Sequence, residues 1–177
     1  PYDEIRKLYR DGFLAVEDGG FWTHNGYSTK GITTMIGSVI LSKFIPSIEP
    51  RGGSTLEQQL IKNVYFGGGA DIKTTTRKIQ EIYLAQQLDH NFSKKDILTY
   101  YVNNLSFAEG DIGIKAVMMT YFGKSPTDYQ ERTIENIAEQ AYMVGLGQNP
   151  TTFNLYEQPK EAHQRTKTVL GVLLESD

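Results

Sequence analysis

A helix start can be read from residues 52–63, which run Gly52-Gly53-Ser54-Thr55-Leu56-Glu57-Gln58-Gln59-Leu60-Ile61-Lys62-Asn63. The two glycines stop any helix that precedes them, and Ser54 followed by Glu57 three residues later matches a capping box. In that arrangement the hydroxyl and the carboxylate each bind a free backbone N–H at the start of a helix. The sequence therefore predicts a helix from Ser54 to about Tyr65.

One side of this predicted helix carries polar groups. Thr55, Gln59 and Lys62 stand at i, i+4 and i+7, while Leu56 and Leu60 share the other side. A hydroxyl, an amide and an ammonium group on one side suit a polar ligand. An ordinary solvent-exposed helix side explains the same pattern, so spacing alone leaves both interpretations open.

Apolar periodicity outward from this segment predicts a mainly α-helical chain. It indicates further helices at about residues 5–17, 27–45, 74–88, 93–103, 112–122, 134–145 and 159–174. In the helix at 74–88, Ile79, Ile82 and Tyr83 are predicted to face inward, and Gly145 is predicted to end the helix at 134–145. Convincing strands and internal repeats are missing, so we predict a single domain over residues 1–177.

Composition narrows the function classes. The 177 residues contain no Cys, which excludes disulfides and thiolate metal sites, and the formal net charge of −3 argues against nucleic acid as the main partner. No apolar run reaches the roughly 18 residues that a membrane-spanning helix needs. Because the chain begins at Pro1 without an initiator Met, we expect a domain excised from a longer protein, with any anchoring segment upstream.

Two charged clusters stand out besides the helix start. The first is Glu17-Asp18-Gly19-Gly20-Phe21-Trp22-Thr23-His24-Asn25-Gly26, an acid pair at a predicted helix end, for which a solvated terminus is the simplest interpretation. The second is Arg77-Lys78-Ile79-Gln80-Glu81, in which two cations stand four and three residues from one carboxylate. An intrahelical ion pair explains the second cluster, and so does a site that holds a diphosphate through charge-assisted contacts.

Taken together and in this order, these segments resemble the glycosyltransferases of family 51, the transglycosylase domains of class A penicillin-binding proteins and of monofunctional relatives. The resemblance covers roughly residues 13–170 and five motifs. Its matching residues are Glu17, Asp18, Phe21, His24 and Gly26; Gly53, Ser54, Thr55, Gln58, Gln59, Leu60, Lys62 and Asn63; Arg77, Lys78 and Glu81; Lys95, Ile97, Leu98, Tyr101 and Asn103; and Gly113, Ala116, Tyr121, Phe122, Gly123 and Lys124. A closing segment with Gln148-Asn149-Pro150, Asn154 and Arg165 is also similar.

The sequence departs from the family pattern at a few positions. Glu57 replaces a usual Thr, Thr99 a usual Glu and Val102 a usual Leu, and Tyr27-Ser28 replaces a more common apolar-acidic pair. Because Glu57 adds a negative charge near a site expected to bind a diphosphate, donor affinity is the property that we expect it to affect.

The resemblance implies a fold and a reaction. Family 51 domains are mostly helical and lysozyme-like, with a large lobe and a membrane-proximal jaw lobe. Residues 27–49 carry an apolar stripe without charge support, and their Gly, Ser and Thr lower helix propensity, so we predict a mobile, jaw-like segment there that contacts lipid. Family 51 domains polymerise lipid II into β-1,4-linked glycan strands, with inversion and release of undecaprenyl diphosphate, in bacterial cell wall synthesis.

The same match implies roles for individual residues. Glu17 is expected to be the catalytic base that takes the proton from the acceptor 4-hydroxyl, and Glu81 the second catalytic carboxylate, which organises the donor diphosphate. The expected substrate-binding residues are Asp18, Phe21, His24, Ser54, Thr55, Gln58, Gln59, Lys62, Arg77 and Lys78. We assign no metal-ligating residue, and a divalent cation, Mg²⁺ or Mn²⁺, at the donor diphosphate stays open.

The resemblance also implies partners and a location. The partners are lipid II, the lipid-linked glycan strand, the membrane surface and other cell wall synthesis proteins, with no nucleic acid. The implied location is the outer face of the bacterial cytoplasmic membrane, with an anchor outside this chain, and a transpeptidase domain further downstream stays open.

Two other function classes remain at this point. A lytic transglycosylase or lysozyme-like enzyme would share the helical fold and one essential Glu but would cleave glycan, and it would not need the cluster of Arg77 and Lys78. A catalytically silent module that only binds wall precursor is the third class, and the intact glutamates speak against it.

Overall fold

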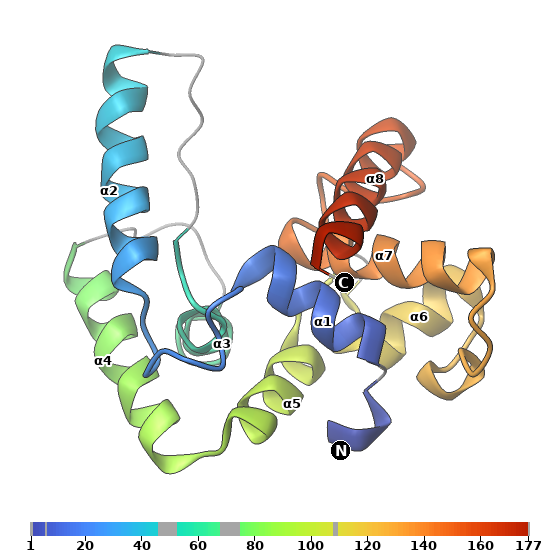
Figure 1. The fold of residues 1–177 in the computed structure, drawn as a ribbon, viewed down its shortest axis with the longest axis horizontal. Coiled ribbons are helices and arrows are strands. Elements are labelled where there is room, and N and C mark those ends of the chain that lie inside the picture. The colour runs from blue at the N-terminus through green and yellow to red at the C-terminus, as the bar shows by residue number, and fades with distance from the viewer. Residues whose placement is uncertain (1, 6, 46–52, 68–74, 108–109, 177) are drawn as a thin grey trace. The chain divides into compact units, whose positions relative to one another are not determined.

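The computed structural model of the chain describes residues 2–5, 7–45, 53–67, 75–107 and 110–176. Its regular structure is helical (Figure 1). In chain order the elements are η1 (Tyr2–Glu4), α1 (Lys7–Glu17), α2 (Thr29–Phe44), α3 (Leu56–Tyr65), α4 (Thr75–Asn91), α5 (Lys94–Asn104), α6 (Ile114–Phe122), η3 (Pro126–Asp128), α7 (Ile134–Gln148) and α8 (Pro159–Ser176). Within the described ranges, β pairing is confined to an isolated bridge between Ser106 and Ile112. The prediction of a mainly α fold is confirmed.

The chain forms two compact units. Unit 1 comprises Pro1–Gly19 and Leu98–Asp177, and unit 2 comprises Gly20–Ile97. The acid pair of the first motif, Glu17-Asp18, therefore belongs to unit 1, whereas the second and third motifs belong to unit 2.

Helix α7 is the centre of unit 1, where it contacts α1, α6 and α8 (Figure 1). A run of buried residues, Ala141–Leu146, supplies its core surface. The helix continues through Gly145 to Gln148, so the prediction that Gly145 ends it is wrong. A Cβ at position 145 would lie 2.9 Å from Cγ of Arg165, and the absence of a side chain there lets α8 lie close to α7.

The apolar side of α1 fixes the end of that helix. Tyr9, Phe13 and Leu14 are buried, and the Phe13 ring packs edge-on against Tyr101 with centroids 5.8 Å apart. Because these residues anchor the last two turns of α1, Glu17 is held at a defined position at the helix end.

Within unit 2, α3 packs against α4. Leu56 and Leu60 are buried on α3, as predicted. On α4, Glu81 and Ala85 are buried, whereas Ile79 and Tyr83 are 63% and 60% exposed. The prediction that Ile79 and Tyr83 face inward is wrong, because the inward side of α4 is taken by an ionic network.

The start of α3 differs by one residue from the predicted capping box. Thr55 is the N-cap, and its Oγ1 accepts from the N–H of Gln58 at 3.3 Å. The same hydroxyl donates to the carbonyl of Gly26 at 2.8 Å. Ser54 does not cap the helix because its hydroxyl accepts from Lys78, and the Glu57 side chain binds Lys94.

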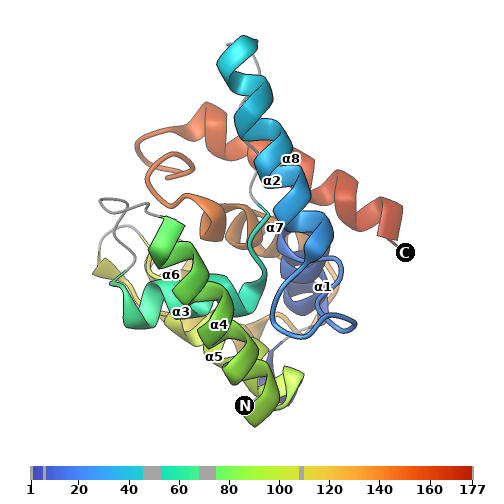
Figure 2. The ribbon, with the colours of Figure 1, turned by 90° about the vertical axis from the view of Figure 1, so that its left-hand side faces the viewer.

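Helix α2 is continuous and is capped at its start by Ser28, whose Oγ accepts from the N–H of Gly31 at 3.0 Å. In both views it extends away from α3 and α4 (Figures 1 and 2). Near its end Leu41, Phe44 and Ile45 are exposed, and residues 46–49 of the predicted lipid-contacting segment lie outside the described residues. Among the described residues, every helix is too short or too polar to span a bilayer.

Candidate active site

Glu17 is the last residue of α1, as predicted, and lies beside a cation. Its carboxylate Oε1 is 3.6 Å from Nη2 of Arg165 on α8, and the two side chains are only 10% and 15% exposed. Burial lowers the pKa of the Arg165 guanidinium from its ordinary value, and the Glu17 charge opposes that shift. The arrangement holds the Glu17 carboxylate against a guanidinium that α8 keeps in place.

The charges of the same acid pair, Glu17 and Asp18, also act on Tyr101 from the fourth motif. Burial raises the pKa of Tyr101 well above its ordinary range, and the negative charges of Glu17 and Asp18 raise it further. The phenol is therefore neutral at physiological pH, and it can donate a hydrogen bond but cannot act as a base. Asp18 itself is buried in unit 1, with its backbone N–H donating to the carbonyl of Leu14.

A surface groove of about 590 Å³ adjoins this region of unit 1. It is lined by Phe153, Lys160, Glu161, Gln164, Arg165 and Thr168. Arg165 thus faces both the groove and Glu17, and its guanidinium lies 5.7 Å from the centroid of the Phe153 ring. An aromatic ring with cationic, amide and hydroxyl groups suits a sugar or another polar ligand.

In unit 2 the charged cluster on α4 forms the ion pairs that its spacing predicts. Arg77 Nε lies 3.1 Å from Glu81 Oε1, and Lys78 Nζ lies 3.3 Å from Glu81 Oε2. Lys78 also donates to Ser54 Oγ at 2.9 Å and to Gln58 Oε1 at 2.8 Å. One network therefore joins α4 to the start of α3.

This network combines two cations with one carboxylate, which leaves it net positive. Its members are half-buried or buried, and the Arg77 guanidinium also lies over the Phe66 ring at 5.0 Å. Gln58 extends the network with its amide, whereas Gln59 and Lys62 are half-buried on the same helix. A partly desolvated, net cationic group of this kind can bind an anion such as a phosphate.

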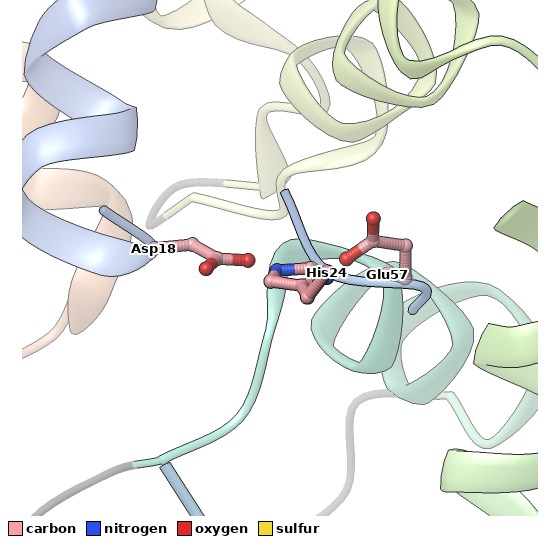
Figure 3. A group of neighbouring side chains, drawn as sticks. All are labelled: Asp18, His24 and Glu57. Carbon is pink, nitrogen blue, oxygen red and sulfur yellow. The ribbon is translucent and has the colours of Figure 1, made fainter. Parts of the chain in front are cut away.

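The remaining first-motif residues lie in the loop before α2. Phe21 is buried and packs edge-on against His24, with centroids 6.3 Å apart. Figure 3 shows His24 beside Glu57, where a ring nitrogen and a carboxylate oxygen lie within 4.8 Å of each other. Asp18, drawn in the same view, belongs to unit 1.

Glu57 is wholly buried, and its Oε1 accepts from Lys94 Nζ at 2.7 Å. Burial raises the pKa of Glu57, and the neighbouring Lys94 and His24 act in the opposite direction. Lys94 lies beside Glu57 and opposes its charge, and the expected effect of Glu57 on donor affinity stays a prediction.

The fifth-motif lysine has a structural environment. Lys124 Nζ donates to both carboxylate oxygens of Glu139 at 2.9 Å and to Glu135 at 3.0 Å, and Tyr129 donates to Glu139 at 2.7 Å. These contacts tie the end of α6 to α7.

Comparisons with known proteins identify the family of the chain. The sequence model of a family described as "Transglycosylase" matches residues 1–173. The chain belongs to the transglycosylase family. This confirms the resemblance, the helical fold class and the enzyme class, that of the peptidoglycan glycosyltransferases.

Curated relatives of this transglycosylase domain are penicillin-binding proteins. Penicillin-binding protein 1A/1B of Bacillus subtilis (strain 168) is 33% identical over 171 residues, which cover 97% of this chain and 17% of that protein. Penicillin-binding protein 1A of Clostridium perfringens (strain 13 / Type A) is 35% identical over 173 residues, 95% of this chain and 24% of that protein. Penicillin-binding protein 1A of Streptococcus oralis is 33% identical over 169 residues, which cover 96% of this chain and 25% of that protein. The chain thus spans only about a fifth of the length of these relatives.

Around Glu81 the transglycosylase domain offers cations rather than metal ligands. Both oxygens of Glu81 face Arg77 or Lys78, and positive neighbours disfavour a divalent cation at that carboxylate. A cation at the donor diphosphate therefore stays a prediction, and the diphosphate oxygens would have to supply its ligands.

Two contacts of this transglycosylase domain could not be predicted from residue spacing, because they join residues that are far apart in the sequence. Glu17 and Arg165 are 148 positions apart, the difference of their residue numbers, and Glu57 and Lys94 are 37 positions apart. The family resemblance marked Arg165 in the closing segment without giving it a role, and no signal in the sequence marked Lys94.

Proposed function

We propose that this domain polymerises lipid II into β-1,4-linked glycan strands with inversion and releases undecaprenyl diphosphate. Membership of the transglycosylase family implies that it binds lipid-linked peptidoglycan precursors. The observation that carries the finer proposal is the network of Arg77, Lys78 and Glu81 with Ser54 and Gln58. An enzyme that only hydrolyses glycan has no diphosphate to hold.

Inversion in a single displacement needs a base at the acceptor hydroxyl and separate assistance to the leaving group. In the proposed mechanism Glu17 takes the proton from the acceptor 4-hydroxyl. That oxygen attacks the anomeric carbon of the donor sugar, and the bond from this carbon to the diphosphate oxygen breaks. Arg165 supports the role of Glu17 because its guanidinium lies beside the carboxylate.

The donor diphosphate carries two negative charges, and the oxygen that leaves the anomeric carbon keeps the bonding electron pair and adds a third, which must be stabilised. Arg77 and Lys78 are proposed to bind its oxygens, with Glu81 holding both cations in place, because all three form a single ion-pair network. Ser54 and Gln58 orient the Lys78 ammonium through the hydrogen bonds that they accept. Lys62 on α3 is proposed as a further cation for the donor.

The other expected substrate-binding residues have supporting roles in this proposal. Thr55 caps α3 and fixes Gly26, Phe21 and His24 form the loop that lies near Glu57, and Asp18 adds charge beside Glu17. Gln59 is proposed to contact a sugar through its amide.

The proposed location of the domain is the outer face of the bacterial cytoplasmic membrane, where it would act beside other cell wall synthesis proteins. The described part of the predicted jaw segment, residues 27–45, is proposed to contact lipid, since Leu41, Phe44 and Ile45 expose apolar surface near the end of α2. Replacing Leu41 and Phe44 by Ser should lower binding to anionic phospholipid vesicles in a sedimentation assay. Unchanged binding would count against this contact.

One assay separates the proposed function from its alternatives. Purified protein is incubated with labelled lipid II and, in parallel, with purified sacculi, and the products are separated by size. Long glycan strands from lipid II support polymerisation. Shortened sacculus fragments would indicate a lytic or lysozyme-like enzyme, and unchanged lipid II and sacculi would indicate a silent binding module.

A further inference from the structure

The buried ion pair between Glu57 and Lys94 is the feature of unit 2 that neither spacing nor the family pattern anticipates. Glu57 stands in the second residue of α3 and is wholly buried, and Lys94 begins α5 with a side chain that is 19% exposed. Lys94 Nζ lies 2.7 Å from Glu57 and 2.5 Å from Asp89 at the end of α4. One ammonium group therefore ties together the ends of three helices.

The same ammonium group also contacts the first-motif loop. Lys94 Nζ lies 4.7 Å from the centroid of the Phe21 ring, a distance at which a cation is attracted to the ring face. Further along the loop, His24 lies within 4.8 Å of the Glu57 carboxylate. Both side chains of the buried pair thus face the loop, each toward a different residue of it.

The far end of this loop is fixed by backbone contacts. Gly26 has φ +80°, and a Cβ there would lie 2.4 Å from the carbonyl oxygen of Ala85 on α4. Its own carbonyl accepts from the Thr55 hydroxyl. Residues 21–26 are therefore held at one end by α4 and the α3 cap, and at the other by Lys94 and Glu57.

We infer that Glu57 and Lys94 form a positioning pair that holds the loop of Phe21 and His24 against the start of α3. The inference rests on the proposed function for its catalytic meaning, because it places Phe21 and His24 among the substrate-binding residues. Glu57 and Lys94 themselves act through the loop.

A single tryptophan makes the loop observable. Trp22 is the only Trp of the chain, lies between Phe21 and His24 in sequence, packs edge-on against Phe21 at 5.1 Å and is half exposed. Its emission and its quenching by acrylamide report loop order without any substrate. This readout separates failure of the positioning pair from failure of the proposed function.

The test compares Lys94→Met, the double variant Glu57→Gln/Lys94→Met and the control Lys167→Met, which removes an exposed lysine of α8. Lys94→Met leaves a buried carboxylate without its cation, so the quenching of Trp22 by acrylamide should be strongest in this variant. Its rate of polymerisation should fall by ~10-fold or more, through kcat rather than KM, as expected for a misplaced group. The double variant removes both charges and keeps a folded domain, as circular dichroism should show. Its quenching and activity should lie between those of Lys94→Met and wild type.

Two results would overturn the inference. If the double variant matches wild type in Trp22 quenching and in turnover, the pair merely balances charge and does not position the loop. If Lys94→Met and Lys167→Met behave alike, Lys94 has no special contact with the loop. Should Lys94→Met fail to fold, the double variant alone still decides between these outcomes.

Discussion

Arg165 on α8 places its guanidinium Nη2 3.6 Å from Oε1 of Glu17 at the end of α1. In unit 1, α1 and α8 pack against each other and against α7, which has no side chain at Gly145 where Arg165 passes. A carboxylate at the C-terminal end of a helix faces the negative end of the helix dipole, and the guanidinium offsets that repulsion. The geometry therefore makes Glu17 and Arg165 the first pair to test.

Replacing Glu17 by Gln should abolish most polymerisation. The amide keeps the size of the side chain but cannot accept a proton from the acceptor hydroxyl, so turnover should fall by the ~10²–10⁴-fold typical of general-base catalysis. The measurement is the rate of strand formation from labelled lipid II, with thermal unfolding as the control for the fold. A rate within about threefold of wild type would be incompatible with the assigned role, given the size of base contributions.

Arg165 should affect turnover through Glu17. Arg165→Met removes the guanidinium beside the carboxylate and should lower kcat by ~10-fold with little change in KM, as for a positioning group. Gly145→Ala should have a smaller effect in the same direction, because the new Cβ would lie 2.9 Å from Cγ of Arg165. Lys167→Met on the same helix serves as the control. A rise in KM with unchanged kcat would instead assign Arg165 to substrate binding in the groove.

The sequence predicted the helices better than it predicted which side of each faces the core. On α4 the apolar residues Ile79 and Tyr83 were expected inside, but Glu81 and Lys78 take that side because Ser54 and Gln58 on the neighbouring chain segment offer partners. Hydrophobic periodicity considers only the spacing of apolar side chains. It cannot predict that a polar side chain turns inward to bind a partner that is distant in sequence.

The same reason explains the shifted helix start and the continued helix α7. Ser54 and Glu57 fit a capping box locally, but Lys78 and Lys94 bind their side chains and leave the cap to Thr55. Glycine often ends a helix, but Gly145 lies within α7, where its lack of a side chain allows close packing against Arg165. The i+3 and i+4 pairs of Glu81 were predictable because they lie within a single helix.

Arg77 should contribute to donor binding. Arg77→Ala removes one of the two cations of the α4 network and should weaken binding of a soluble short-chain prenyl diphosphate by ~10-fold, in line with the loss of a charge-assisted contact. Isothermal titration calorimetry measures the affinity, and Arg132→Ala, which removes an exposed arginine, is the matched control. Equal affinities for Arg77→Ala and wild type would remove Arg77 from the diphosphate site.

Glu57 should give the stability of the domain a characteristic pH dependence. Burial raises the pKa of Glu57 above its ordinary value of 4.5, so the folded chain holds this proton more tightly than the unfolded chain does. Its contribution to stability is therefore greatest at and below that ordinary value and is lost as the pH rises through the raised pKa. Urea unfolding measures the free energy of unfolding of wild type and of Glu57→Gln. As the pH is lowered from about 7 to about 4.5, wild type should gain stability relative to the variant. A difference that does not change with pH would mean that Lys94 cancels the effect of burial.

The last prediction separates Glu17 and Glu81, the two glutamates that are proposed to be catalytic and to have different chemical roles. Glu81 holds Arg77 and Lys78 through its two oxygens, so Glu81→Gln should misplace the cations and lower turnover by ~10–10²-fold, the effect of losing contacts between charged groups. It should not change the proton transfer. The rate of Glu81→Gln should therefore still rise with pH on the acid side, because Glu17 must lose its proton before it can accept one. Any residual rate of Glu17→Gln should lack that rise. Binding of the prenyl diphosphate gives the complementary readout, because it should change in Glu81→Gln and stay the same in Glu17→Gln. If Glu81→Gln leaves diphosphate binding intact and removes the rise with pH, the roles of the two glutamates must be exchanged.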